Sequence, residues 1–243
     1  MFSVNSKHAF SITTINSPSC KDIVAHALRT CTDTKDKSDS TEEYIGPKDK
    51  ALILKNAIKL DHSSTLEHLT YTFQLNGFSR ALLIELSRHR VASLSVQSTR
   101  YTLDKALNSL SVKVALDKYE NNDYIITLDQ KREIVDALYV TPPAILADRA
   151  AHSFYVDRLF ENLVDIEYLF SLGLKNDNVK YLLHESWRFE AVWTVNARSL
   201  RNFFRLRSAS SALWEMQIFS NMVYEALPSD QRFYFEDIFN WEV

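Results

Sequence analysis

Leu69-Thr-Tyr-Thr-Phe-Gln-Leu75 is one of two runs that place strands among the helical patterns of this chain. Its apolar and polar residues alternate, and this period of two predicts a β-strand with one buried face. Asn76-Gly77 follows directly and is a typical turn signal. A second alternating run, at 189–195, predicts another strand.

Helical patterns surround these two runs. Apolar residues recur at helical spacing over 18–31, 50–60, 144–172, 177–186, 199–206 and 210–227, and shorter helices are predicted at 79–89 and before Pro142-Pro143. Residues 32–43 and 91–103 are predicted loops, and 104–145 is the least readable part, with a strand predicted at 124–128. Since the strands do not alternate regularly with helices, the pattern disfavours a doubly wound sheet. The sequence predicts an α+β fold: one helix-rich domain, 1–243, with a small, mostly antiparallel sheet.

Local signals add detail to these elements. Ser64–Glu67 matches a capping box, Ser79 is a predicted N-cap, and Gly173 is a predicted helix stop. Trp193 and Trp214 are predicted core residues.

Composition excludes several classes of protein. Of the 243 residues, 46% are hydrophobic and 24% are charged, as in an ordinary soluble protein, and no apolar run is long enough to span a membrane. The three glycines are far apart, which excludes a Rossmann fingerprint and a P-loop, so any nucleotide must be held by side chains. The net charge of −3 argues against a general nucleic-acid binder. Two cysteines without a CxxC pair and the lack of a signal peptide predict a cytoplasmic protein.

Residues 87–100 form the first of two arginine-rich segments. They hold three arginines, one histidine and five hydroxyl side chains, and no carboxylate lies between Glu85 and Asp104. Guanidinium groups and hydroxyls suit a phosphate and the carbonyl edge of a pyrimidine. The alternative is a solvated surface whose cations stabilise a helix C-terminus.

Residues 196–207 form the second arginine-rich segment, with four arginines and no acid. Arg198, Arg201, Asn202 and Arg205 are spaced to share one helix face. Arg207 falls on the apolar face if the helix continues that far, and a cation there needs an anionic partner. The alternative is a surface helix that ends at Arg205.

Other chemistry finds little support. His62 and His68 are six residues apart, which is not a zinc spacing, so no metal is predicted. Ser98 lies in no hydrolase motif. Neither cysteine lies near the arginine-rich segments, so no covalent nucleophile is predicted.

Arg88-His89-Arg90, seven further residues and Ser98 resemble the RHRx7S signature of flavin-dependent thymidylate synthases. Three other segments resemble that family in the same order: 62–68, Trp193–Arg207 and Trp214–Gln217. The resemblance covers about 20–103 and 175–240.

The resemblance implies a homotetramer with active sites shared between subunits, which makes dTMP from dUMP. It implies FAD as cofactor, with methylenetetrahydrofolate as carbon donor and NADPH as reductant. The implied FAD-binding residues are His62, Ser64, Arg88, His89, Arg90, Asn196, Arg198 and Asn202. The implied dUMP-binding residues are Glu85, Arg88, Gln97, Ser98, Arg100, Lys180 and Arg207. Of these, Arg207 is expected to favour ionisation at N3 of the uracil and Ser98 to orient the nucleotide.

Three departures from the family pattern keep alternatives open. Glu85 replaces a common Gln, and its carboxylate can face either the nucleotide or an arginine. Val96 replaces a polar residue, and Lys180 replaces an arginine. The alternatives are a degenerate relative that binds flavin or dUMP without turnover, and an RNA- or nucleotide-binding module.

Overall fold

A computed structural model of the protein describes residues 10–16, 23–32, 47–109 and 126–239. They divide into two units, which are described separately. Unit 1 contains Phe10, Asn76–Leu83 and the described part of Val96–Glu190. Unit 2 contains the described parts of Ser11–Leu75 and Ala191–Val243, together with Ile84–Ser95. The single domain over 1–243 stays a prediction.

A four-stranded sheet lies mainly in unit 2, with the order β1-β2-β4-β3. Its strands are β1 (Ser11–Asn16), β2 (Thr70–Ser79), β3 (Ala92–Val96) and β4 (Arg188–Asn196). Both alternating runs are confirmed as strands, and they form the two central ones, β2 and β4. Tyr71, Phe73 and Trp193 are at most 1% exposed, whereas Thr72 and Thr194 join their hydroxyls at 3.1 Å. The predicted α+β class with a small antiparallel sheet is therefore confirmed.

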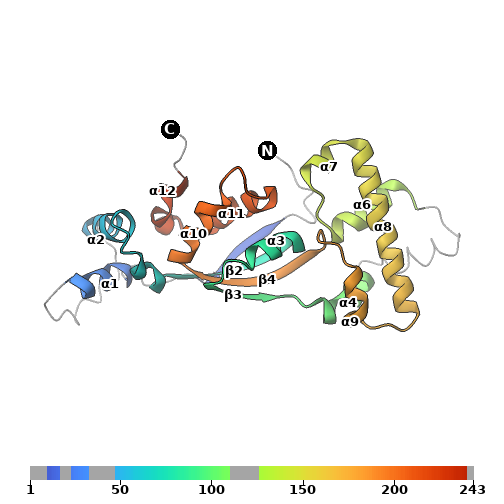
Figure 1. Ribbon diagram of the computed structural model, residues 1–243, viewed down its shortest axis with the longest axis horizontal. Helices are drawn as coiled ribbons and strands as arrows, with labels where there is room; N and C mark the ends of the chain where they lie inside the picture. The colour runs from blue at the N-terminus through green and yellow to red at the C-terminus, as the bar shows by residue number, and fades with distance from the viewer. Residues whose placement is uncertain (1–9, 17–22, 33–46, 110–125, 240–243) are drawn as a thin grey trace. The chain divides into compact units, whose positions relative to one another are not determined.

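Two helices of unit 2 cover one face of this sheet (Figure 1). They are α10 (Ala197–Arg207) and α11 (Trp214–Ala226), and η4 (Ser229–Tyr234) and α12 (Glu236–Phe239) follow. The ring of Trp193 lies 5.3 Å from that of Phe203 and 5.8 Å from that of Phe219, between ring centroids. Trp193 is thus a core residue as predicted, while Trp214 is only half-buried.

The N-terminal helices of unit 2 are α1 (Ile23–Thr32), α2 (Pro47–Ile53), the π-helix η1 (Leu54–Lys59) and the 3-10 helix η2 (Ser63–His68). The predicted helix at 50–60 is present, but its second half widens to a π-helix. Asp61 has a φ of +56°, an uncommon conformation for a residue with a side chain, between η1 and η2. The capping box at Ser64–Glu67 is wrong: these residues lie inside η2, which has no side-chain cap.

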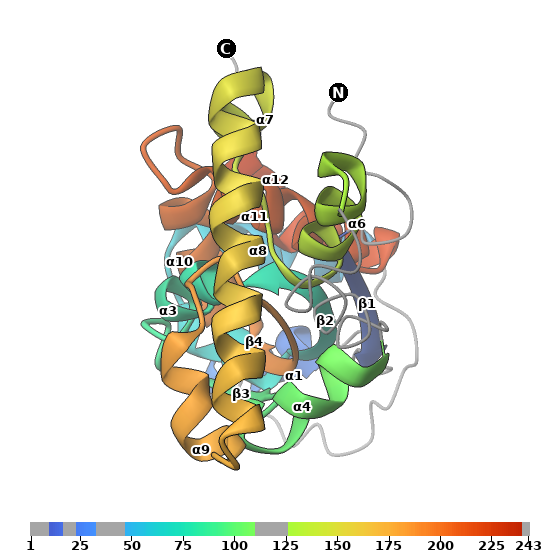
Figure 2. The same ribbon diagram turned by 90° about the vertical axis from the view of Figure 1, so that its right-hand side faces the viewer.

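Unit 1 is built around the long helix α8 (Arg149–Ser171), with α6 (Leu128–Leu138) and α7 (Pro143–Ala147) beside it (Figure 2). Its remaining helices are α4 (Thr99–Ser109), α9 (Asn176–Val179) and η3 (Lys180–Leu182). The predicted helix at 144–172 is split at Asp148, whose carboxylate accepts from the Ala151 amide at 2.8 Å and caps α8. Gly173 ends α8 as predicted, with a φ of +80°.

Three local predictions are wrong. Asn76-Gly77 is not a turn, because Gly77 accommodates a φ of +82° and β2 continues to Ser79. Residues 91–103 are not a loop but β3 and the start of α4. Two of the hydroxyls that suggested a loop, those of Ser93 and Ser95, lie on the exposed face of β3, an edge strand of the sheet. Of the strand predicted at 124–128, residues 124–125 lie outside the described ranges and the rest is not a strand, since α6 begins at Leu128.

The other helix predictions agree with the structure in outline. The helix at 18–31 is found over Ile23–Thr32 within the described residues, and 177–186 is replaced by the shorter α9 and η3. Most of the predicted loop at 32–43 lies outside the described residues. No helix among those described is long and apolar enough to cross a lipid bilayer.

Candidate functional site

Three chemically important side chains of unit 2 lie at the end of α3 (Arg80–Leu86) and in the turn after it. Ser79 caps this helix as predicted, because its Oγ accepts from the Leu82 amide at 3.1 Å. The last turn is closed by the amide of His89, which donates to the Leu86 carbonyl at 3.1 Å. Glu85, Arg88 and His89 are therefore neighbours at spacings of three and four residues.

Arg207 is held by this turn. Helix α10, which the second arginine-rich segment forms, continues to Arg207. This is the condition under which Arg207 was predicted to lie on the apolar face of the helix. Its Nε donates to Nε2 of His89 at 3.0 Å, its Nη1 lies 3.0 Å from Oε2 of Glu85, and its Nη2 lies 3.5 Å from the Glu85 carbonyl. All three guanidinium nitrogens thus contact residues 85–89. With its side chain only 17% exposed, Arg207 has a fixed plane and a defined anionic partner.

His89 is a half-buried histidine with a lowered pKa. Burial is the main cause, the positive charge of Arg207 adds to it, and Glu85 acts in the opposite direction on the pKa. The edge of its ring meets Phe203, with 5.0 Å between centroids. Because Nε2 accepts from Arg207, the neutral imidazole carries its proton on Nδ1. His89 is therefore a neutral side chain that orients Arg207.

A pocket of about 350 Å³ opens beside this contact, within the size range of small-molecule sites. Among its lining residues are four arginines, Arg88, Arg90, Arg198 and Arg207, which come from both arginine-rich segments. The remaining lining residues are Glu67, His89, Val91, Ser199, Asn202 and Leu206. This cation-rich lining suits an anionic ligand such as a phosphate or diphosphate.

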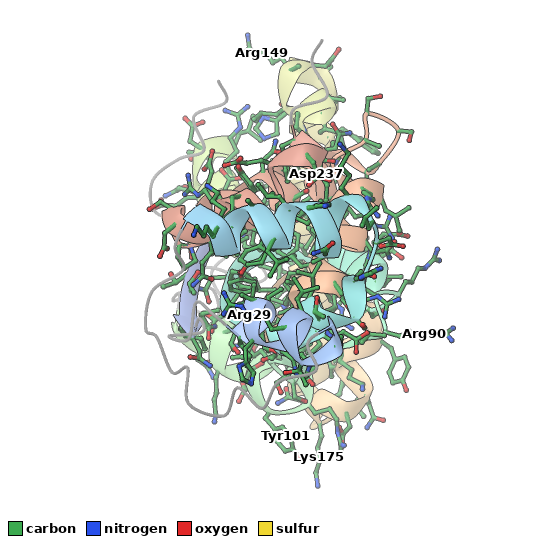
Figure 3. The ribbon with its side chains drawn as sticks, turned by 90° about the vertical axis from the view of Figure 1, so that its left-hand side faces the viewer. Arg29, Arg90, Tyr101, Arg149, Lys175 and Asp237 are labelled. Carbon is green, nitrogen blue, oxygen red and sulfur yellow. The ribbon has the colours of Figure 1, made fainter. Side chains whose placement is uncertain are left out.

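Glu67 lines the pocket, although no motif in the sequence predicted it as a site residue. Its Oε1 lies 2.5 Å from Nη1 of Arg198, so a carboxylate fixes one of the four arginines. Arg88 is 69% exposed and lies 3.8 Å from Glu85, and Arg90 extends into solvent (Figure 3). The only sequence signal for Glu67 is its place between His62 and His68, in a segment that already resembled the family.

The predicted arginine face of α10 needs a correction. Arg198 and Asn202 line the pocket, but Arg201 is 4% exposed and points elsewhere. Both of its terminal nitrogens pair with Asp237 of α12, at 2.7 and 2.6 Å, and one also donates to the Tyr234 carbonyl. Arg205 is exposed and does not line the pocket. The helical spacing did not predict that Arg201 points away from the pocket, because its partner Asp237 is 36 residues further on.

Asn196 and the two candidates from η2 contribute differently from the pocket residues. The Oδ1 of Asn196 accepts from the Ser199 amide at 2.9 Å, which caps α10 and sets its first turn. His62 and Ser64 are exposed and do not line the pocket. The His62 carbonyl accepts from Oγ1 of Thr65 at 2.9 Å, which fixes the backbone rather than the imidazole.

Four predicted dUMP residues lie in unit 1. Ser98 directly precedes α4, and its carbonyl accepts from the Tyr101 amide at 3.0 Å. Arg100 is paired with Asp177, with 3.3 Å between Nη2 and Oδ2, and this pairing lowers the pKa of Asp177. Lys180 places its Nζ 5.4 Å from the ring centroid of Tyr181, and the Gln97 amide donates to the Glu190 carbonyl at 2.8 Å. Arg100 lies on α4 and Lys180 on η3, and these two elements contact each other.

The described residues offer no metal-binding cluster of histidine, cysteine or carboxylate side chains. Cys31 is exposed on α1, and Cys20 lies outside the described ranges. The charged and titratable groups at and beside the pocket are therefore arginines, a neutral histidine and two carboxylates. The carboxylates are Glu67 and Glu85, and each is paired with an arginine.

Fold and pocket together define an α+β protein with an arginine-lined pocket that suits an anionic, nucleotide-like ligand. Comparison with known proteins gives the family. The family described as thymidylate synthase complementing protein matches residues 14–229. A flavin-dependent thymidylate synthase of Wolinella succinogenes is 42% identical over 213 residues, 88% of this chain and 91% of that protein. One of Helicobacter pylori is 40% identical over 219 residues, 89% of this chain and 93% of that protein.

A solved structure gives the same result. The crystal structure of the Helicobacter pylori enzyme ThyX with FAD and dUMP has a TM-score of 0.74 and 31% identity, over 96% of this chain and all of that one. This chain belongs to the flavin-dependent thymidylate synthase family, as the RHRx7S segment predicted.

Proposed function

We propose that this protein is an enzyme that converts dUMP to dTMP with FAD as its cofactor. The observation that carries the proposal is the pocket, where both arginine-rich segments meet around Arg207 and His89. Family membership supports it, as do the FAD and dUMP bound in the solved Helicobacter pylori relative.

The pocket fits the flavin cofactor by its chemistry. The two phosphates of FAD can be held by the guanidinium groups of Arg88, Arg90 and Arg198. Asn202 adds a side-chain amide to the lining of the pocket. His89 contributes a neutral ring, and Val91 and Leu206 add apolar contacts. Asn196 acts as the cap that positions α10, and His62 and Ser64 stay proposed flavin contacts from outside this pocket. When bound, the flavin supplies the hydride.

The residues of unit 1 that we propose for dUMP suit its phosphate by their chemistry. Ser98 and Arg100 sit at the N-terminal end of the eleven-residue helix α4, where amide groups and the helix dipole favour an anion. Lys180 and Gln97 complete the proposed set. Ser98 orients the phosphate or sugar through its hydroxyl and forms no covalent bond.

Among the residues of unit 2 that we propose for dUMP, Arg207 suits the pyrimidine, and Arg88 and Glu85 are its neighbours. A guanidinium with a fixed plane in a partly buried site stabilises negative charge that develops on the ring after N3 ionises. His89 keeps that plane by accepting from Nε. No protein nucleophile takes part in this proposal, in which the residues position the reactants and supply the electrostatic field.

The other reactants and the assembly are proposals from the family resemblance. Methylenetetrahydrofolate is the carbon donor and NADPH the reductant of the flavin. The protein acts in the cytoplasm as a homotetramer with shared active sites. It binds neither nucleic acid nor membrane in this role.

The test is dTMP formation by the purified protein, measured by chromatography, with each component omitted in turn. We expect product only when dUMP, FAD, NADPH and methylenetetrahydrofolate are all present. Retained FAD and dUMP binding without product would identify a degenerate relative. RNA binding that falls steeply with salt, without flavin binding, would favour the binding-module alternative.

A further inference from the structure

Arg207, the pocket arginine whose guanidinium contacts the turn after α3, already has an anionic partner in Glu85. Glu85 Oε2 lies 3.0 Å from Nη1 of Arg207, and the Glu85 carbonyl lies 3.5 Å from Nη2. The side chains are 17% and 27% exposed, so the pair is partly shielded from water. Its attraction is therefore screened less than that of a surface ion pair.

Arg207 is the principal counter-ion of Glu85. Among the described residues, the second cation paired with this carboxylate is Arg88, but it lies 3.8 Å away and is 69% exposed. His89, the other titratable neighbour on the turn, is held as an acceptor by Arg207 and is favoured in its neutral form.

This pairing has a consequence for any ligand that needs Arg207. The guanidinium donates from Nε to His89 and from Nη2 to the Glu85 carbonyl, and its Nη1 forms the ion pair with the Glu85 carboxylate. Nη1 and Nη2 each carry two N–H groups, so a ligand oxygen either bonds beside the Glu85 carboxylate, close to its negative charge, or displaces the carboxylate from Nη1. A partly buried arginine without a partner is unfavourable, so Glu85 also stabilises the site when no ligand is present.

We propose that Glu85 is an internal anion that occupies Arg207 in the ligand-free protein and gives up Nη1 to the pyrimidine ring when dUMP binds. This inference rests on the proposed function, and it makes Glu85 a specificity-determining residue. Its negative charge lowers the affinity for an anionic nucleotide, while the His89 contact keeps the guanidinium plane through the exchange.

The test is the dissociation constant of dUMP, measured by calorimetry on FAD-loaded wild type, E85Q, R207K and the double variant. The Glu85→Gln change keeps an oxygen acceptor and removes the charge. We expect E85Q to bind dUMP about five- to tenfold more tightly than wild type. In the R207K background the same change should have less than a third of that effect, because the guanidinium fork is absent.

The matched control is E161Q, which makes the same change in net charge at an exposed ion pair with Arg158 of unit 1. It should leave dUMP affinity within twofold of wild type. Weaker dUMP binding by E85Q would mean that the carboxylate contacts the nucleotide directly, and unchanged binding would mean that it does not compete. Either result overturns the exchange while wild-type binding upholds the proposed function. Wild type that binds FAD but no dUMP would overturn both.

Discussion

Nε of Arg207 lies 3.0 Å from Nε2 of His89 and joins two residues 118 positions apart in the sequence. One comes from the first arginine-rich segment and the other from the second. Their contact orders the wall of the pocket, since it fixes both the plane of the guanidinium and the tautomer of the imidazole.

The substitution Arg207→Ala is expected to lower kcat by roughly 10²–10³-fold, the loss that follows removal of one donor to a developing anion. Arg205→Ala is the matched control, because Arg205 is exposed on the same helix and does not line the pocket. Full turnover in R207A would remove Arg207 from the mechanism. Urea unfolding of both variants checks that stability changes far less than turnover.

The protonation of His89 gives a second prediction. Its pKa should lie below the ordinary value of about 6.5, should rise in R207M, where the nearby positive charge is lost, and should fall further in E85Q. NMR titration of the imidazole measures these shifts. A pKa above 6.5 in wild type would contradict the neutral assignment.

The same shift predicts how stability depends on pH. Since the folded state disfavours protonated His89, the unfolded state binds more protons below about pH 6.5. The free energy of unfolding should therefore fall as the pH drops from about 6.5 through the lower folded-state pKa. Denaturant titrations of wild type and H89Q over this window should show a shallower fall for H89Q.

The ion pair between Arg201 and Asp237 is expected to matter for folding. Arg201 is 4% exposed, so its truncation breaks a pair that is shielded on the arginine side. We expect R201A to lower the free energy of unfolding by about 2–4 kcal/mol, against within about 0.5 kcal/mol for R205A. Equal unfolding midpoints of the two variants would show that the pair contributes nothing.

The substitution Arg88→Ala is expected to weaken FAD binding by at least tenfold, because a charge-assisted contact to a phosphate is lost. Dissociation constants from flavin fluorescence measure the effect, and dUMP binding should weaken as well. R149A is the control, since Arg149 lies at the start of α8 in unit 1. Equal FAD affinity of R88A and R149A would exclude Arg88 from the flavin site.

Ser98 is expected to orient dUMP rather than attack it. S98C should keep part of the turnover because a thiol can still take part in a weak hydrogen bond. S98A should raise the KM for dUMP. Full activity with unchanged KM in S98A would show that the hydroxyl is dispensable.

The sequence predicted those parts of the fold and site that have a local signal. The alternation at 69–75 and 189–195 identified both central strands, and the arginine-rich segments identified four arginines of the pocket. The RHRx7S segment identified the family. These features are readable because each depends on residues that are close together in the chain.

The features that the sequence did not predict depend on distant partners or exposed strands. Glu67 lines the pocket and pairs with Arg198, which is 131 positions away in the sequence. Arg201 does not line the pocket because it pairs with the carboxylate of Asp237. The edge strand β3 was read as a loop because its hydroxyl residues face solvent. Local periodicity carries no information about such long-range pairings.

The visible absorption spectrum, recorded after incubation with excess FAD and removal of unbound flavin, shows directly whether this protein is a flavoprotein. We expect a retained spectrum of oxidised flavin in wild type and a strongly reduced one in R88A. A correctly folded wild-type protein that retains no flavin under these conditions would contradict the assignment of the arginine-lined pocket to FAD.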